Sequence, residues 1–323
     1  MIQATVGTYL NRGDRPTKNG FGEGLLDAGL VNKNVIALGA DITGSVGMDL
    51  FAGEFPDRFF SLGIAEQNCV GVSAGMARSG KIPVFATYGV FSALRTTDFI
   101  RISVCYNELH VVIGGAHAGI SVGPDGATHQ ALEDIAVMRV MPNMTILSPC
   151  DATQTRLATK AAIQEIDGPV YLRFGRAPVP DFTGPDDGFL PGKAQMMTEG
   201  DDISIIATGH LVWEALLAHK QLADKGINAR VINMHTIKPL DMDCVIRAAE
   251  ETGLIVTAEE HQITGGLGSA VAECLSQNHP VPVKFVGMPD SFGESGNPGE
   301  LMFKYGMSAQ KIVESAERLL ARK

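Results

Sequence analysis

The chain has 323 residues, of which 45% are hydrophobic, 19% charged and 6% aromatic. These ordinary values exclude a disordered chain and a small disulfide scaffold, and the length predicts two domains with a large core. Against 36 Asp and Glu stand 26 Lys and Arg, which gives a formal net charge of −10. A chain with this charge is a poor general binder of nucleic acid or of anionic membrane.

The cysteines and the start of the chain indicate a reducing compartment. None of the five cysteines forms a C-x-x-C pair, so we expect buried free thiols rather than a zinc site or a disulfide framework. The first residues, MIQATVGTYLNRGDRP, lack the apolar core of a signal peptide. No uninterrupted apolar stretch reaches the roughly 18 residues of a membrane span. We therefore expect a cytoplasmic protein.

Short apolar runs alternate with helix-like segments through the first part of the chain. This order is typical of a parallel sheet that helices cover on both faces. The predicted strands are 35–39, 83–87, 109–114, 144–147 and 170–173, and the predicted helices are 20–28, 64–78, 90–104, 131–139 and 152–166.

A linker-like stretch then interrupts the alternation. Residues 178–192, PVPDFTGPDDGFLPG, are rich in proline, glycine and aspartate. We therefore expect an α/β protein of two doubly wound domains with mainly parallel sheets, 1–185 and 186–323. In the second, the predicted strands are 203–208, 229–234, 254–259 and 283–287, and the predicted helices are 213–225, 242–252, 268–276 and 309–322.

Ligands of open parallel sheets bind beyond the carboxyl ends of the strands, so the loops after strands are candidate sites. In GIAEQN at 63–68, Glu66 begins a predicted helix, and the positive end of the helix dipole would stabilise its carboxylate. Glu66 is a candidate site residue, although complementing the helix N-terminus alone would also explain a glutamate there. The rings of Phe85, Tyr88 and Phe91 could stack on a flat heterocycle or pack in the core. Arg95 and Arg101 nearby could bind an anion or only solvate a helix.

The glycine-rich segment 114–130, GGAHAGISVGPDGATHQ, is long enough to indicate a functional loop, although a surface crossover stays open. Its His117 and His129 are candidates for binding a polar substrate or moving protons. His129 and Glu133 have i, i+4 spacing, but no third ligand follows, so we predict no metal held by this chain alone.

GGLGS at 265–269 precedes a helix in the second domain. The pattern is incomplete as a dinucleotide fingerprint, so a nicotinamide-binding protein is disfavoured and close helix packing is the better interpretation. His261, just before it, is expected to be structural.

Together these motifs resemble the C-terminal half of transketolases. GIAEQN and D-G-x-T-H-Q in one frame are specific to transketolase-like enzymes, and the second motif argues against the related dehydrogenase components. The resemblance implies a pyrimidine-binding domain followed by a transketolase C-terminal domain. It is carried by Ala40-Asp41-Ile42, GIAEQN at 63–68, the aromatic residues of 85–91, GPDGATHQ at 123–130, MPNMTILSPCDATQT at 141–155, GPVYLRFGR at 168–176, KPLD at 238–241 and GGLGSAV at 265–271.

The family holds thiamine diphosphate and Mg²⁺ through a GDG…N motif in an N-terminal domain. This sequence has no GDG, and Gly200-Asp201-Asp202 is the nearest approach. The resemblance therefore implies the second subunit of a split transketolase, completed by an N-terminal subunit that carries the GDG motif and the Mg²⁺ ligands, in a heterotetramer of two plus two. Such an enzyme moves a two-carbon ketol unit from a ketose phosphate to an aldose phosphate.

The resemblance also assigns roles on the cofactor side. Glu66 would bind the pyrimidine nitrogen of thiamine diphosphate and bias its tautomer, while the cofactor supplies the carbanion. Asp41 would lie near the thiazolium. Phe85, Tyr88 and Phe91 would wall in the pyrimidine.

On the substrate side, the resemblance implies that His129 and Asp125 contact hydroxyls near the reacting carbons. Ser45, His117 and Arg176 match positions that contact the substrate phosphate, where charge-assisted hydrogen bonds are strong.

Two points qualify this anion site. Arg173 is the alternative phosphate-contacting residue if the match between this sequence and the family is shifted along the chain. Lys18 stands where the family usually has an arginine, and lysine lacks the bidentate fork, so a sulfonate is an alternative to a phosphate.

Two other functions stay open. A carboligase like deoxyxylulose-phosphate synthase would use pyruvate and normally forms a single chain. A non-catalytic scaffold subunit would not need Glu66 and His129, which are both present.

Overall fold

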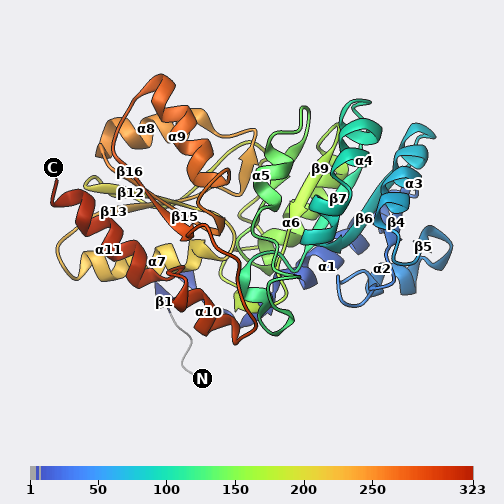
Figure 1. The fold of residues 1–323 in the computed structure, drawn as a ribbon, viewed down its shortest axis with the longest axis horizontal. Helices are drawn as coiled ribbons and strands as arrows, with labels where there is room; N and C mark the ends of the chain where they lie inside the picture. Colours follow the sequence, from blue (N-terminus) through green and yellow to red (C-terminus); the bar gives the residue numbers. More distant parts are fainter. Residues whose placement is uncertain (1–4, 7–8, 323) are drawn as a thin grey trace.

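Two sheets with helices on their faces stand side by side in this computed structural model, which describes residues 5–6 and 9–322 (Figure 1). The N-terminal sheet and the C-terminal sheet come from consecutive halves of the chain, as predicted, apart from one edge strand described below. The described residues do not include 1–4, 7–8 and 323. The predicted N-terminal features and the outer limits of the two predicted domains fall partly on these residues.

The first sheet has the strand order β14-β8-β9-β7-β6-β4-β5, and all neighbours are parallel except β14. The helices that cover it include α1 (Thr17–Val31), α2 (Asp49–Glu54), α3 (Glu66–Arg78), α5 (Asp134–Arg139) and α6 (Ala152–Gln164). Its strands are β4 (Val35–Gly39), β5 (Phe59–Ser61), β6 (Ile82–Tyr88), β7 (Val112–Ala116), β8 (Thr145–Leu147), β9 (Val170–Arg173) and β14 (Thr236–Lys238).

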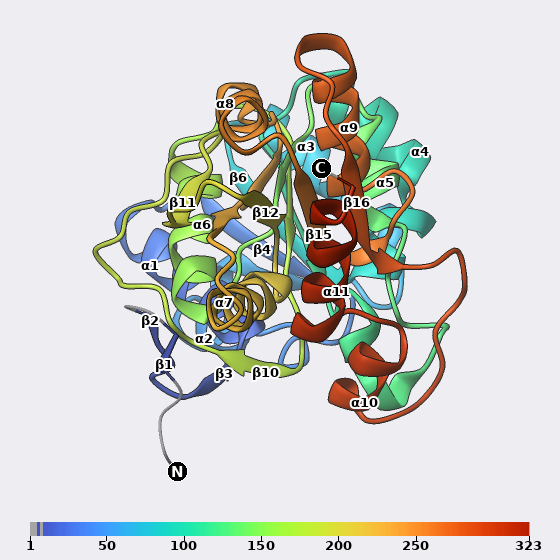
Figure 2. The same ribbon diagram turned by 90° about the vertical axis from the view of Figure 1, so that its left-hand side faces the viewer.

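The second sheet has the order β11-β13-β12-β15-β16, with only β11 antiparallel to its neighbour. Helices α7 and α11 cover one face, and α8 and α9 cover the other (Figure 2). The strands are β11 (Gln195–Thr198), β12 (Ile203–Ala207), β13 (Ala229–Asn233), β15 (Ile255–Gln262) and β16 (Val283–Met288). The helices are α7 (Leu211–Ala223), α8 (Met242–Thr252), α9 (Leu267–Asn278), α10 (Pro298–Lys304) and α11 (Ala309–Leu320).

The segment predicted as a helix at 90–104 is helical, but most of it is π-helix. Two π-helical stretches, Phe91–Arg95 and Ile100–Cys105, flank the short α4 (Thr97–Phe99). The hydroxyls of Thr96 and Thr97 donate to the carbonyls of Ser92 and Ala93, at 2.6 and 2.5 Å. Threonine hydroxyls that donate hydrogen bonds to backbone carbonyls one turn earlier disturb a regular α-helix.

The strand predicted at 109–114 is shifted and includes Gly115, from the predicted loop. A Cβ at Gly115 would lie 2.0 Å from the Tyr171 hydroxyl oxygen, so glycine leaves room for the Tyr171 side chain on this face of the sheet. The predicted helix at 131–139 begins only at Asp134, because Ala131 bridges to Ala118 instead.

Short pairings also escaped prediction. The linker-like stretch begins with β10 (Pro178–Pro180), which pairs antiparallel with β3 (Asp14–Pro16). Strand β14 comes from the second half of the chain but joins the first sheet beside β8. A further hairpin joins β1 (Thr5–Val6) and β2 (Tyr9–Leu10).

All five cysteines are free, and all except the half-buried Cys244 are buried. Among the described residues, no helix is both long and apolar enough to cross a membrane. The cytoplasmic location stays a prediction.

Helix α1 packs closely on helix α6 through glycine. At Gly20 an added Cβ would lie 1.9 Å from the backbone oxygen of Ala152. We predict that Gly20→Ala lowers the free energy of unfolding by about 1–3 kcal/mol, because two backbones must move apart.

Gly71→Ala in α3 is the matched control, since nothing lies within 4 Å of the added Cβ. It should stabilise the protein by up to ~1 kcal/mol through helix propensity. Urea unfolding of both variants measures the difference, and equal effects would contradict the close packing.

Candidate active site

Three neighbouring parallel strands place the candidate residues at one edge of the first sheet. Gly39 of β4 pairs with Ala86 of β6, and Tyr88 at the end of β6 pairs with Ala116 of β7. The segments that follow these strands therefore start side by side. They carry Asp41 and Ser45, then Phe91, and then His117.

Tyr88 lies at the centre of this edge. Its ring centroid is 4.4 Å from that of His117 and 5.7 Å from that of His129. The Phe91 centroid is 5.5 Å from the His129 ring. The Tyr88 hydroxyl lies 2.9 Å from the Ser45 hydroxyl, within hydrogen-bond distance. The structure thus brings these predicted residues together, although they come from separate loops.

The prediction that Phe85 walls in the pyrimidine is not met. Phe85 has no exposed surface and packs in the core with Cys69 and Ile113. Side chains alternate between the faces of a strand, so residues 85 and 88 of β6 face opposite sides of the sheet. Of the three aromatic residues predicted here, Tyr88 and Phe91 present their rings at this edge.

Glu66 is buried at the first residue of α3, with 2% of its surface exposed. The positive end of the helix dipole favours a carboxylate there. Arg95 donates to its Oε2 at 2.8 Å, and the Arg95 guanidinium lies 4.4 Å from the centre of the Phe91 ring. Glu66, Arg95, Phe91 and Tyr88 therefore form an unbroken series of side-chain contacts. The sequence showed Arg95 only as a possible anion ligand.

Two cations lie on the other side of the cluster. Arg176 donates to Asp125 at 2.8 Å, which brings two predicted substrate residues into contact. The Lys18 ammonium donates to the Ser45 carbonyl at 3.1 Å. Asp41, after β4, is exposed and has a left-handed backbone with φ 64°. This edge thus carries three kinds of group: the Glu66 carboxylate, the aromatic rings, and the positive charges of Lys18 and Arg176.

His117 is buried between these charges. Burial, followed by the positive charges of Lys18 and Arg176, lowers the pKa of His117 to about 4. The ring is therefore neutral near pH 7, and its buried Nδ1 lacks a hydrogen-bond partner among the described residues. An orphaned polar atom of this kind indicates a place for a bound polar group. His129 accepts or donates a hydrogen bond with the Thr128 hydroxyl at 2.9 Å.

Arg173 is not a substitute anion ligand. It is buried, and its Nε donates to Asp134 at 2.8 Å. Its Nη2 donates to the carbonyls of Ala131 and Glu260. Arg176, the first choice, is the exposed arginine of this stretch.

The GGLGS segment does not form a dinucleotide site. The carboxylate of Glu259 accepts hydrogen bonds from the amides of Leu267 and Gly268, at 2.7 and 2.8 Å. A protein carboxylate thus occupies the helix N-terminus where a phosphate would bind. His261 is fully buried, and its Nε2 lies 3.3 Å from the Ala136 amide that donates to it, in keeping with a structural role.

The lowered pKa of His117 has a measurable consequence. The unfolded chain, with an ordinary histidine, binds more protons than the folded chain between pH 6.5 and 4. We predict that stability falls as the pH falls through this window. NMR titration, with His117→Asn to assign the signal, should give a pKa about 4, and a value near 6.5 would contradict the burial.

Comparison with known proteins gives the same family for both halves. Residues 14–181 match the transketolase pyrimidine-binding domain, and residues 192–312 match the transketolase C-terminal domain. The chain is similar over 95% of its length to a solved split-gene transketolase, described as an inactive beta4 tetramer, with 46% identity and a TM-score of 0.89. It covers 98% of that chain.

Two curated relatives are subunits of similar length. The chain is 42% identical to the 6-deoxy-6-sulfo-D-fructose transketolase subunit SqwH of Clostridium sp. strain MSTE9, covering 93% of this chain and 92% of that one. It is 43% identical to an apulose-4-phosphate transketolase subunit of Phocaeicola vulgatus, covering 93% and 96%. The chain belongs to the transketolase family and corresponds to the C-terminal subunit of a split transketolase.

Proposed function

We propose that this chain supplies the pyrimidine-binding and substrate-binding half of a thiamine-diphosphate-dependent transketolase site. The observation that carries this proposal is the series of neighbouring side chains from buried Glu66, through Phe91 and Tyr88, to His117 and Arg176. A buried carboxylate beside aromatic rings suits an aminopyrimidine, and the cationic end suits an anionic sugar.

The described residues of this chain suit the pyrimidine end of thiamine diphosphate. Glu66 would accept a hydrogen bond from the pyrimidine ring, and Arg95 would keep its carboxylate in place. Tyr88 and Phe91 would contact the ring face, and Asp41 would lie toward the thiazolium. When bound, thiamine diphosphate supplies the carbon nucleophile that protein side chains lack. Among the described residues, no cluster of three or more His, Cys, Asp or Glu side chains is placed to hold a metal ion.

We therefore assign the Mg²⁺ and diphosphate site to an N-terminal subunit that carries the GDG motif. Exposed apolar side chains occur near Glu66 and Arg95 in the sequence and support this assignment, because apolar surface is common at interfaces. These are Ile64, Leu94, Phe99, Ile102 and Tyr106. We propose a heterotetramer of two plus two subunits, in which the partner covers this face. The relative described as an inactive beta4 tetramer is compatible with an incomplete site in this chain alone.

The substrate is proposed to be an anionic ketose that gives up a two-carbon unit to an aldose. Lys18 and Arg176 supply the positive charge, and Ser45 and the neutral His117 add hydrogen bonds. His129 and Asp125 would contact the hydroxyls near the reacting carbons. The names of the two relatives give one sulfonated sugar and one sugar phosphate. We propose a sugar phosphate, with a sulfonate as the alternative that Lys18 leaves open.

Glu66 is tested by Glu66→Gln in the complex with the N-terminal subunit. We predict that turnover falls roughly 100-fold or more, because the amide cannot bias proton transfer as the carboxylate does. The fold, measured by circular dichroism, should be unchanged. Glu23→Gln, which alters a carboxylate paired with Arg15 away from the site, is the control. Near-normal turnover of Glu66→Gln would refute the cofactor assignment.

The anion site is tested by Arg176→Met. We predict a KM for a phosphorylated donor about 10- to 100-fold higher, because a hydrogen bond to a charged group contributes ~1.5–3 kcal/mol. The KM for the unphosphorylated sugar should change little. Arg156→Met is the matched control, since Arg156 pairs with Asp27 outside the site. An equal effect of both variants on KM would argue against an anion site at Arg176.

A further inference from the structure

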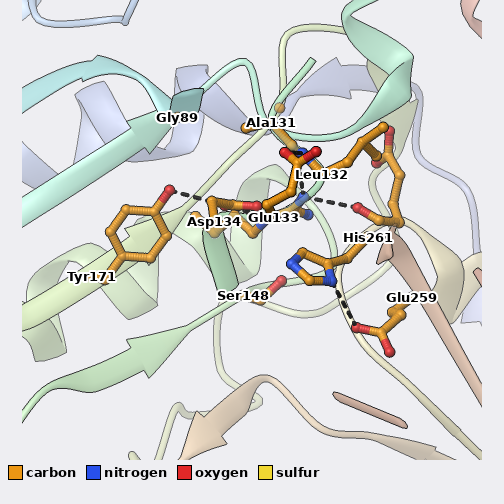
Figure 3. A network of polar contacts seen from close by, with 12 residues as sticks. Gly89, Ala131, Leu132, Glu133, Asp134, Ser148, Tyr171, Glu259 and His261 are labelled. Atoms are coloured by element: carbon orange, nitrogen blue, oxygen red, sulfur yellow. Dashed lines mark hydrogen bonds and ion pairs between the residues drawn. The ribbon is translucent and has the colours of Figure 1, made fainter. Parts of the chain in front are cut away.

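The last residues of β15, in the C-terminal domain, bind directly to the first domain. The Gln262 amide donates to the Leu132 carbonyl at 2.9 Å, and the Glu260 carbonyl accepts from Arg173 at 2.8 Å. Figure 3 shows His261 beside the segment from Ala131 to Asp134, with Glu259 next to His261. Gln262 thus holds the segment that follows residues 117–130, whereas the Glu260 carbonyl holds Arg173 of β9. We call residues 117–130 the substrate loop.

The Glu260 side chain reaches into the substrate loop itself. Its Oε1 accepts a hydrogen bond from the Ser121 amide at 2.7 Å, and its Oε2 lies 3.1 Å from Nδ1 of His210. Glu260 is 3% exposed. Burial raises its pKa, but contacts with His210 and Arg173 outweigh burial and leave the pKa of this carboxyl below its ordinary value. The loop amide therefore binds a buried carboxylate.

The loop backbone needs such support. His117 has a left-handed φ of 51°, and Gly119 has a φ of 86°. A left-handed conformation is uncommon for a non-glycine residue and persists only where its surroundings enforce it. At Gly119 an added Cβ would lie 2.2 Å from Glu260 Oε1, so the carboxylate lies directly against the loop backbone.

A second segment of the C-terminal domain holds the other side of the loop. Gln130 donates to the Glu294 carbonyl at 2.9 Å, and the Gly296 amide donates to the Gly123 carbonyl at 3.4 Å. The loop that carries His117, Asp125 and His129 is therefore fixed at several points by residues far beyond it in the sequence.

We propose that Glu260 is a positioning residue for substrate binding. By accepting the Ser121 amide, it holds the substrate loop in the conformation that brings His117 and Asp125 to the edge of the first sheet. The C-terminal domain thereby acts on substrate affinity through the loop. The substrate-binding consequence rests on the proposed function, whereas the ordering of the loop does not.

Hydrogen exchange of the full chain tests the ordering of the loop without cofactor, substrate or partner. In Glu260→Ala, the amides of 117–126 should exchange at least about fivefold faster, because loss of a partner for a buried donor costs ~1–3 kcal/mol. Glu260→Gln, which keeps an oxygen for the Ser121 amide, should restore much of the protection. If Glu260→Ala does not fold, Glu260→Asp tests the same contact: its shorter side chain withdraws the carboxylate from the Ser121 amide, so exchange at 117–126 should again be faster.

Glu259→Ala is the matched control, because Glu259 is equally buried but bonds the start of α9. It should speed exchange around 266–270 and leave 117–126 unchanged. In the complex with the N-terminal subunit, Glu260→Ala should raise the KM for a phosphorylated donor about tenfold more than it lowers kcat. The proposal is overturned if exchange at 117–126 is unchanged in Glu260→Ala, or if Glu259→Ala speeds exchange at 117–126 as much as Glu260→Ala does. An unchanged KM of Glu260→Ala in an active complex would also overturn it.

Discussion

The parallel pairing of β4, β6 and β7 is the constraint on which the site depends. Because parallel strands end at the same edge, Tyr88 at the end of β6 must lie there together with the segments that carry Ser45 and His117. Helix α3 adds Glu66 at its buried N-terminus, and Arg95 links this carboxylate to the Phe91 ring. The site is thus built where parallel strands end, and a helix and the loops that follow the strands complete it.

Two buried charged residues, Arg173 and Glu260, join the two domains. Arg173 binds the Asp134 carboxylate and the Glu260 carbonyl, while the Glu260 carboxylate binds the Ser121 amide. These two contacts between the domains are hydrogen bonds to a buried charged group, and such a bond is costly to break because the buried charge is left without its partner. The contact between the domains is therefore specific in geometry, and it runs through the loop that carries the substrate residues.

Short apolar runs and helix-like segments predicted the long elements well, and α8 coincides with the predicted 242–252. The patterns failed where tertiary contacts decide. Strand β14 is an edge strand of three residues with no pattern of its own, and Phe85 turned inward because strand geometry overrides ring spacing. Glu66 and the two loop histidines were visible as motifs. Glu260 was not, because its role depends on a loop far away in the sequence.

The central claim is that this chain holds half of a cofactor site and lacks the other half. Calorimetry of thiamine diphosphate with magnesium, for this chain alone and after mixing with its N-terminal subunit, tests it most directly. The account predicts tight binding only in the mixture, lost when Glu66 is replaced. Tight binding by this chain alone would contradict it, and so would the absence of binding in both cases.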